Sequence, residues 1–319
     1  MSFLPDSYSY GNISHEKWEE IFSEISGKTN EEIQEYLLSQ KLKGKWAYIK
    51  TFRNNKADGL FFLPITDNDV VLDIGCGPGS LTIPVARTCR HVYAVDATLA
   101  RLRFLEIRKR NEKAENITPI HASALAMPFK EPLFDHILMN GVFEYMGEWG
   151  SGNDPGEIQK SVLRETKNLL KEKGTLFIAI ENRFGLDFFY KERDHNKLYL
   201  TSIMPRFLAN ITNMIFNKKR YLTYTHSFNA YNKMLLEAGF TKINFFYAWP
   251  DYRDPRYIFA HSSRNIFKYY LENFIKTASK FNYYFFKMAY KFGIERFFVS
   301  HFIITARKQS NSEKIKPGN

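Results

Sequence analysis

The stretch that decides the fold is VVLDIGCGPGSL, which runs from Val70 to Leu81. Its first part, Val70–Ile74, has the apolar, β-branched composition of a buried strand. Three glycines follow the strand at alternate positions: Gly75, Gly77 and Gly79. Glycine permits positive φ and leaves bare backbone against which a ligand can lie. The stretch therefore predicts a strand, a ligand-binding turn and a helix that begins near Ser80.

An acidic residue follows this turn where a nucleoside would need it. HVYAVD is predicted to be the second strand, and it ends in Asp96, about twenty residues beyond the turn, where a carboxylate can accept hydrogen bonds from ribose hydroxyls. The dinucleotide fingerprint needs a glycine at Ser80 and has no counterpart of Pro78, so the order G-x-G-x-G disfavours nicotinamide. Cys76 has no histidine beside it in sequence, and we interpret it as a packing residue rather than a nucleophile.

Short β-rich runs alternate with amphipathic segments along most of the chain, from VVLDI to the final run VSHFIITARK. Because parallel strands need crossover connections, this alternation predicts an α/β fold with a doubly wound, mostly parallel, seven-stranded sheet. The expected parts are an N-terminal helical extension over 1–66, a catalytic domain over 67–308 with helical insertions at 183–226 and 250–296 that form a lid, and a flexible tail over 309–319.

The N-terminal extension is predicted to be helical over residues 13–56. Apolar residues recur there at helical spacing, and Thr29 with Glu32 has the form of a capping box. The recurring apolar residues are Trp18, Ile21, Phe22 and Ile25.

Composition limits the partners and the compartment. The net charge of +11 favours an anionic partner: nucleic acid, a phosphorylated or lipid-linked saccharide, or a membrane surface. No apolar run approaches the roughly 20 residues that cross a bilayer, and the first residues lack a signal peptide, so a cytoplasmic protein is expected. Two cysteines provide neither a disulfide framework nor a metal site, and no metal is predicted.

At the glycine turn and Asp96 the sequence resembles the class I S-adenosylmethionine-dependent methyltransferases, from about Val70 to Phe246. The resemblance implies a Rossmann-like fold, with S-adenosylmethionine as cofactor and Asp96 on its ribose. HASALAMPF resembles the segment that closes over the adenine, although Ser123 stands where family members often carry an aspartate. The cofactor-binding residues expected on this basis are Asp73, Gly75, Cys76, Gly77, Gly79, Asp96, Ala97, Ser123, Ala124, Asn140 and Gly141.

Four later stretches carry a narrower resemblance. They are IENRFGLDFFYKERDH, SIMPRFLAN, YLTYTHSFNAYNKMLLEAGF and FFYAWPDYRDPRYI. Together they resemble a bacterial group of methyltransferases associated with surface-polysaccharide assembly. This resemblance implies a glycan or glycan-linked lipid as the methyl acceptor. Peripheral contact of residues 264–297 with the inner face of the membrane would suit a lipid-linked acceptor.

Methyl transfer is an in-line displacement, so the enzyme mainly positions the acceptor and removes its proton. An NPPY-type motif is absent because Gly141, Val142 and Phe143 follow Asn140, which favours a hydroxyl or carboxylate acceptor over a nucleobase amine. The candidate general bases, in order, are Glu144, His195, His226 and Glu181. The candidate substrate-binding residues are Tyr145, Asn182, Arg183 and Arg206. Each has a structural alternative, such as a helix cap or a solvated surface charge.

Residues 264–297 interleave lysines with phenylalanine and tyrosine. This pattern fits an amphipathic lid helix packed on its own domain, a membrane-interface segment, or a surface that stacks RNA bases, in that order of preference. Three alternatives to a glycan methyltransferase also stay open at this point: an RNA methyltransferase, a non-catalytic scaffold with the same fold, and, last, a dehydrogenase.

Overall fold

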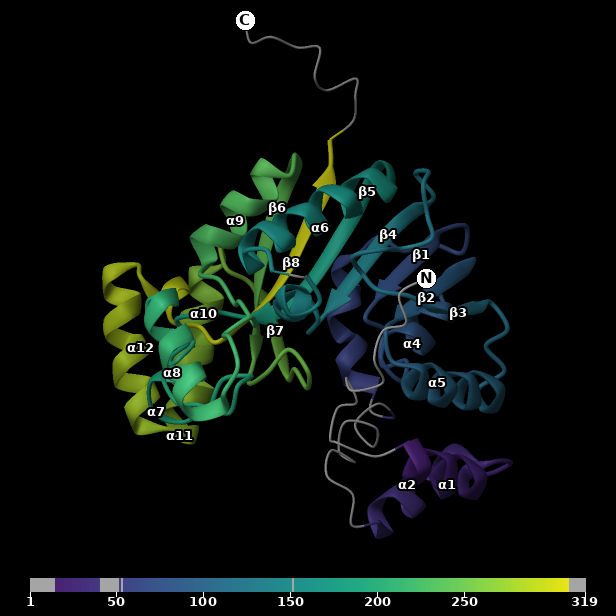
Figure 1. Ribbon diagram of the computed structural model, residues 1–319. Coiled ribbons are helices and arrows are strands. Elements are labelled where there is room, and N and C mark those ends of the chain that lie inside the picture. The colour runs from purple at the N-terminus through teal and green to yellow at the C-terminus, as the bar shows by residue number, and fades with distance from the viewer. Residues whose placement is uncertain (1–14, 41–51, 53, 151, 310–319) are drawn as a thin grey trace, which may run out of the picture. The chain divides into compact units, whose positions relative to one another are not determined.

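The computed structural model describes residues 15–40, 52, 54–150 and 152–309, which form two compact units (Figure 1). The first unit comprises Met1–Asn140 and Asn168–Thr175, and the second comprises Gly141–Lys167 and Leu176–Asn319. The predicted helix over 13–56 and the predicted tail over 309–319 fall partly outside the described residues.

The described strands follow the order β3-β2-β1-β4-β5-β8-β6-β7. Their bounds are β1 Val70–Ile74, β2 His91–Asp96, β3 Ile117–His121, β4 Phe134–Asn140, β5 Leu170–Glu181, β6 Phe240–Trp249, β7 Tyr257–Ala260 and β8 His301–Lys308. The predicted number of seven was wrong, because β7 adds an eighth strand. Its four residues lie inside the predicted insertion 250–296 and pair antiparallel with the end of β6, from Phe246↔Ala260 to Trp249↔Tyr257.

In the first unit, β1 pairs parallel with both β2 and β4, and β2 pairs parallel with β3. All five residues of β1 are buried, as expected for a central strand covered on both faces. The crossovers are α4, Thr82–Ala86, and α5, Leu99–Asn111. Since all these strands point the same way, the ends of β1 and β2 bring the glycine turn and Asp96 to one edge of the sheet.

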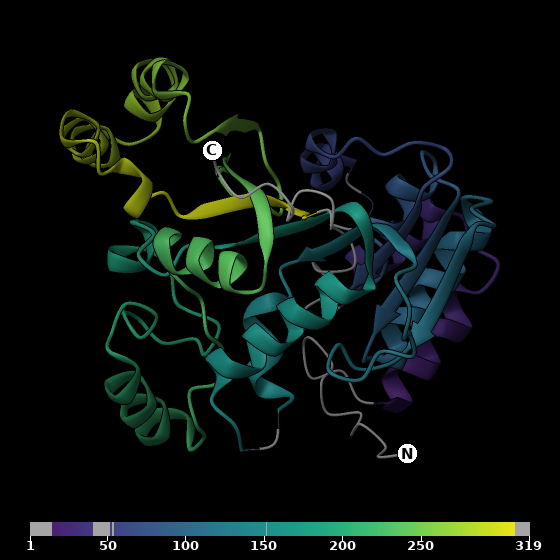
Figure 2. The same ribbon diagram turned by 90° about the horizontal axis from the view of Figure 1, so that it is seen from above.

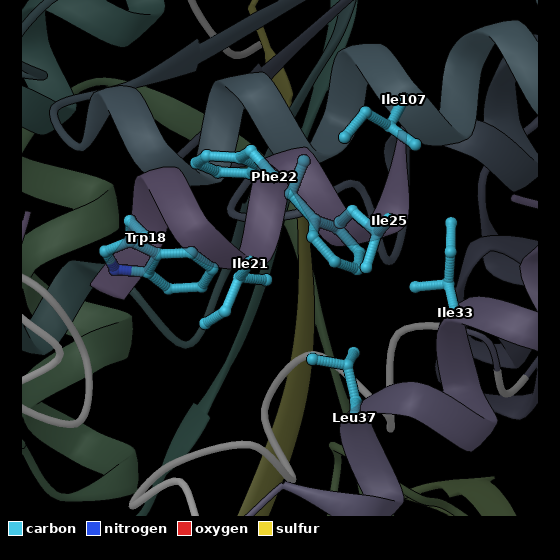
Figure 3. Close-up of a cluster of buried hydrophobic side chains, with 8 residues drawn as sticks. Trp18, Ile21, Phe22, Ile25, Ile33, Leu37 and Ile107 are labelled. Carbon is cyan, nitrogen blue, oxygen red and sulfur yellow. The ribbon is translucent and has the colours of Figure 1, made fainter. Parts of the chain in front are cut away.

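The N-terminal helices α1, His15–Ile25, and α2, Asn30–Ser39, pack with α5 in a separate apolar cluster (Figure 3), and η3, Asn54–Phe62, follows. The helical spacing predicted for Trp18, Ile21, Phe22 and Ile25 is confirmed, since all four side chains are buried. The predicted capping box is also confirmed: the Thr29 amide donates to Glu32 Oε2 at 2.7 Å and the Glu32 amide to Thr29 Oγ1 at 3.3 Å.

In the second unit, β6 pairs antiparallel with both β7 and β8. Because Tyr247 pairs with Phe302, the end of β6 and the start of β8 lie at the same edge of the sheet.

The first predicted insertion contains α7 and α8, and the second contains α10, α11 and α12; the lid arrangement stays a proposal. The helices of this unit are η4 Phe143–Glu148, α6 Pro155–Leu169, α7 Asp187–Tyr190, α8 Arg206–Asn217, α9 Phe228–Glu237, α10 Arg264–Tyr270, η5 Leu271–Ile275, α11 Lys276–Ala278, α12 Lys280–Phe292 and η6 Glu295–Phe297 (Figure 2).

The cluster around Ile21 is expected to stabilise the first unit. Ile21 is fully buried, so Ile21→Ala leaves a cavity and lowers the free energy of unfolding by about 3 kcal/mol in urea denaturation. Glu35→Ala, at an exposed position of the neighbouring helix α2, is the control and should change it little. Equal stability of the two variants would contradict this packing.

Candidate functional site

The glycine turn after β1 exposes bare backbone. Gly75, Gly77 and Gly79 all have positive φ, at 70°, 55° and 86°. A Cβ atom added to Gly77 would meet no atom within 4 Å, whereas one on Gly79 would come within 2.5 Å of Leu105 Cδ1. Gly79 is therefore needed for the close approach of α5, and Gly77 leaves open space in which a ligand can lie against the main chain.

A buried arginine that the sequence analysis missed braces this turn. Arg108 Nη1 donates to the carbonyl oxygens of Pro78 and Gly79, both at 3.0 Å. Its Nη2 pairs with Glu112 at 3.1 Å. The sequence shows Arg108 only as one of several basic residues on α5, with no signal that separates it from its neighbours.

Asp96, at the end of β2, is joined to the glycine turn by a hydrogen bond. Its Oδ2 accepts from the Gly77 amide at 2.9 Å, and its Oδ1 accepts from the Thr98 amide at 2.8 Å. Arg101 Nη1 lies 3.5 Å from Oδ2. A carboxylate offers about four lone-pair sites, so Asp96 keeps acceptor capacity for two ribose hydroxyls.

Asp73 has a different environment from Asp96. Its Oδ2 accepts from Thr82 Oγ1 at 2.6 Å, which joins the end of β1 to the start of α4. Burial raises the pKa of Asp73 and the charge of Asp96 adds to the rise, while the hydrogen bond from Thr82 acts against it. The resulting pKa is about 7. Asp73 thus stabilises the turn through its hydrogen bond with Thr82, and its predicted contact with the cofactor stays a prediction.

The remaining cofactor candidates are placed on loops that follow the strands. His121 Nε2 lies 3.0 Å from the Ala97 carbonyl oxygen, and Ser123 Oγ accepts from the Leu125 amide at 3.1 Å. Ala124 and Cys76 are buried. Asn140 ends β4 in the first unit, and Gly141, which opens the second unit, has a φ of 62°. The open backbone at Gly77 and the capacity of Asp96 fit a nucleoside cofactor in the first unit.

Three of the four predicted general bases meet in the second unit. His195 Nε2 lies 3.5 Å from Glu181 Oε2 and 3.9 Å from Glu144 Oε1. Both carboxylates are buried, and neither oxygen of Glu144 has a hydrogen-bond partner. Tyr145 Oη lies 2.8 Å from His195 Nδ1, so this predicted substrate residue is placed against the histidine.

The three groups shift one another's protonation. Burial raises the pKa of Glu144 to about 8, and the charge of Glu181 adds to the rise. Burial lowers the pKa of His195, but the charge of Glu181 outweighs it and raises the value to about 9. Burial acts to raise the pKa of Glu181, but His195 and Arg253 outweigh it and hold the pKa below its ordinary range. Near neutral pH the cluster therefore holds an ionised Glu181, a protonated His195 and a protonated Glu144.

Two residues missed by the sequence analysis complete this cluster. Tyr252 Oη donates to Glu181 Oε1 at 3.3 Å, and Arg253 Nη1 lies 3.7 Å from the same oxygen. Arg253 also pairs with Asp251 at 2.8 Å. Both residues belong to the stretch FFYAWPDYRDPRYI, which carries the narrower resemblance but no motif that points to acid–base chemistry.

His226 does not join the cluster through its ring. Its Nε2 lies 2.7 Å from Gln159 Oε1, and Gln159 in turn donates to the carbonyl oxygens of Phe143 and Tyr224. Burial, together with the charges of Arg206 and Arg183, lowers the pKa of His226 to about 3. His226 is thus a neutral ring held by an amide, and its role as a base stays a prediction without support from this geometry.

The predicted substrate-binding residues Asn182, Arg183 and Arg206 point donors at backbone carbonyls. Asn182 Nδ2 donates to the carbonyls of Phe297 and Val299, at 2.9 and 2.8 Å. Arg183 donates to the carbonyls of Ser202 and Met204, at 2.9 and 2.5 Å, and Arg206 donates to the Thr225 carbonyl. The arginine bonds order the insertion 183–226, where these carbonyls have no partner in a helix or strand, and the Asn182 bonds join the end of β5 to the segment before β8.

The residue types in the cluster are also those that bind divalent cations. One ligand atom from each of Glu144, Glu181 and His195 lies within 4.8 Å of the others. The sequence predicts no metal. Arg253 and the protonated His195 already supply positive charge beside Glu181, which favours an acid–base cluster over a cation site.

A pocket of about 390 Å³ adjoins the cluster within the second unit. Asp251 lines it and pairs with Arg253, which reaches Glu181. The pocket combines aromatic rings with hydrogen-bonding groups: Tyr190, Trp249, Asp187, Asp251, Asn282 and His301.

Comparison with known proteins identifies the family. A family model described as a methyltransferase domain matches residues 65–229, which is more than half of the chain. The chain belongs to this methyltransferase family. Its members use S-adenosylmethionine as methyl donor, so the cofactor predicted from the glycine turn agrees with the family.

Curated relatives share part of this methyltransferase domain. A probable cobalt-precorrin-6B C(15)-methyltransferase (decarboxylating) of Methanothermobacter thermautotrophicus is 31% identical over 121 residues, which are 37% of this chain and 56% of that protein. An (S)-coclaurine N-methyltransferase of Thalictrum flavum is 25% identical, over 44% of this chain and 37% of the relative. Ribosomal RNA small subunit methyltransferase G of Klebsiella pneumoniae is 32% identical, over 25% of this chain and 40% of the relative.

The chain thus spans about half or less of the length of these relatives. Their names differ in the acceptor, so the matches concern the shared domain. A solved structure, Haemonchus contortus phosphoethanolamine N-methyltransferase 2 with phosphomonomethylethanolamine and S-adenosylhomocysteine, aligns with a TM-score of 0.50 at 15% identity, covering 93% of this chain and 61% of that one. This likeness confirms the predicted class I methyltransferase fold and nothing finer.

The contact between Asp96 and ribose can be tested by binding. Asp96→Asn replaces the carboxylate that would accept hydrogen bonds from the ribose hydroxyls by a neutral amide. The affinity for S-adenosylmethionine should therefore fall roughly tenfold to hundredfold in isothermal titration. Asp67→Asn, an exposed acid before β1, should bind as the wild type does. Unchanged affinity in Asp96→Asn would contradict the assignment.

The buried cluster should make stability depend on pH. Glu144 and His195 bind protons more tightly in the folded chain than their ordinary values of 4.5 and 6.5 imply. Their stabilising contributions are therefore full at low pH and are lost as pH rises through about 8 and about 9. The free energy of unfolding should fall between about pH 4.5 and 8 through Glu144 and between about pH 6.5 and 9 through His195, by up to about 1.4 kcal/mol per pH unit for each group.

Glu144→Gln should reduce this slope, because a neutral amide has no proton to lose in that range. Denaturation series at several pH values measure the effect, with the exposed substitution Glu157→Gln as control. A slope that is the same in wild type and Glu144→Gln would show that Glu144 does not titrate as described.

Proposed function

We propose that this chain transfers a methyl group from S-adenosylmethionine to a hydroxyl oxygen, with Glu144 as general base. The observation that carries this proposal is the buried Glu144 carboxyl, whose pKa of about 8 lies near neutrality. A general base works best when its pKa lies near the working pH, and an ordinary glutamate is too acidic for that.

The residues of the chain have separate tasks in this reaction. Backbone at Gly77 and the carboxylate of Asp96 hold the nucleoside, whose sulfonium supplies an activated methyl carbon. The acceptor oxygen forms its bond to that carbon as the carbon–sulfur bond breaks, and the hydroxyl proton passes to Glu144. Glu181 stays ionised between His195 and Arg253, and Tyr145 fixes the orientation of the His195 ring.

The pocket of the second unit supports a saccharide acceptor. Tyr190 and Trp249 provide flat aromatic faces, and Asp187, Asp251 and Asn282 provide groups that bond hydroxyls. Together with the resemblance to methyltransferases of surface-polysaccharide assembly, this lining favours a glycan or a glycan-linked lipid. The acceptor would then enter beside the Asp251–Arg253 pair that leads to Glu181.

An RNA acceptor is the second candidate. It is supported by the net charge of +11 and by the relatives named as ribosomal RNA methyltransferases. The sequence Gly141-Val142-Phe143 after Asn140 favours the hydroxyl acceptor, because it lacks the prolines that shape a nucleobase-amine site. The two acceptor classes can be distinguished by whether the RNA fraction or the glycan fraction of an extract takes up the methyl group.

Membrane contact through residues 264–297 remains part of this proposal, with a cytoplasmic protein peripheral at the inner membrane face. In this segment α10 and α12 bury one face, and apolar and basic residues alternate on the other. The exposed large apolar residues of α10 and α12 are Ile266, Tyr269, Phe281, Tyr284, Met288 and Phe292.

The proposed reaction can be tested with labelled methyl donor. Wild-type protein incubated with labelled S-adenosylmethionine and fractionated bacterial extract should label a glycan or glycan-lipid fraction. Glu144→Gln should lower the rate about hundredfold or more, and Glu157→Gln should not. Label found only in RNA would overturn the acceptor, and a full rate in Glu144→Gln would overturn the base.

Two conditions sharpen this test. The wild-type rate should rise as pH passes about 8, because Glu144 then loses its proton and can act as the base. A chelator should leave the rate unchanged, since the cluster is assigned to acid–base chemistry. Loss of the rate with chelator and its return with a divalent cation would assign the cluster to metal binding instead. A folded protein that binds no S-adenosylmethionine would indicate a scaffold.

A further inference from the structure

Helix α8, Arg206–Asn217, buries a polar face and exposes its apolar face. Surface helices of globular proteins normally turn their apolar face inward. In α8 the buried residues are Ala209 and Asn213, and six large apolar side chains are exposed instead. They are Phe207, Leu208, Ile211, Met214, Ile215 and Phe216, between 42% and 69% exposed.

Hydrogen bonds from the polar face hold α8 in this orientation. Asn213 Nδ2 donates to the carbonyl oxygens of Lys219 and Arg220, both at 3.0 Å. Asn217 Nδ2 donates to the Asn196 carbonyl at 2.9 Å. Because the asparagine face is bonded to the second unit, the apolar face is fixed outward.

Positive charge accompanies this apolar face. Residues 206–220 contain no acidic residue, and Lys218, Lys219 and Arg220 follow the helix directly and are exposed. Asn213 holds the carbonyls of the last two against the helix, so the charges stay beside the apolar side chains. An apolar face bordered by cations complements an anionic lipid surface, which offers hydrocarbon beneath negative headgroups.

We propose that α8 docks this protein on an anionic lipid bilayer. The helix lies flat, with its apolar side chains among the acyl chains and the basic triplet on the headgroups. Its 12 residues extend about 18 Å, less than the roughly 30 Å of a hydrocarbon core. In the parts of the chain that the structure describes, no helix is long and apolar enough to cross a membrane.

A second set of exposed apolar side chains lies on α12, which Figure 2 shows well apart from α8 in the second unit. The bilayer contact of α8 does not depend on α12 or on the proposed methyl transfer. It would bring the protein to the surface where a lipid-linked acceptor resides.

Vesicle binding tests this inference without any activity measurement. The full-length protein is sedimented with vesicles of phosphatidylcholine alone and of phosphatidylcholine with phosphatidylglycerol in equal parts. The wild type should bind the anionic vesicles, and salt should weaken the binding. Ile215→Glu with Phe216→Glu should lower the binding at least about tenfold, because two exposed anchors are lost and two negative charges are added.

A matched control distinguishes an effect specific to α8 from a general effect of acidic substitutions on the surface. Phe61→Glu with Leu236→Glu also replaces two exposed apolar residues and adds two negative charges, but outside α8, and should bind as the wild type does. Lys218→Gln with Lys219→Gln should weaken binding to anionic vesicles.

Three results would overturn the inference: no binding of wild type to anionic vesicles, equal binding by the α8 variant, or equal loss in the control variant. Dimers of wild type in lipid-free sedimentation that become monomers in the α8 variant would assign the face to a second copy of the chain instead.

Discussion

The hydrogen bond from the Gly77 amide to Asp96 Oδ2 is the interaction on which the proposed cofactor site depends. It joins the turn after β1 to the end of β2, so two segments nineteen positions apart become one surface. The bond uses one acceptor site of a buried carboxylate and leaves others for ribose. A longer side chain at Gly77 would fill the open space above the backbone, and a side chain at Gly79 would collide with α5.

The second unit presents a different physical problem, which is the burial of several charges. Burying an isolated carboxylate is costly, and the structure offsets this cost for Glu181 with His195 and Arg253. Glu144 receives less compensation, since neither of its oxygens is bonded, and its pKa rises accordingly. The same burial that disfavours the carboxylate of Glu144 makes it a stronger base once ionised. The proposed role of Glu144 as a base and the local cost of its burial thus have one cause.

The sequence predicts best the features that are local along the chain. The glycine turn, the acid at the end of β2 and the capping box at Thr29 follow from short patterns. The meeting of His195 with Glu144 and Glu181 does not, because His195 lies in an irregular insertion whose path depends on tertiary contacts. Tyr252 and Arg253 were missed for the same reason. Arg183 and Arg206 donate to carbonyls of that insertion, which the sequence does not show, and their predicted contact with substrate stays a prediction. Strand β7 was not predicted, because it has only four residues and pairs only with the end of β6 among the described pairings.

The central claim, that the backbone of the glycine turn and Asp96 hold a nucleoside methyl donor, is tested most directly by a crystal structure with S-adenosylhomocysteine. The ribose hydroxyls should lie on the Asp96 carboxylate and the amino-acid part of the ligand over Gly77. A crystal in which this turn stays empty at saturating ligand, or in which the ligand binds elsewhere on the chain, would contradict it.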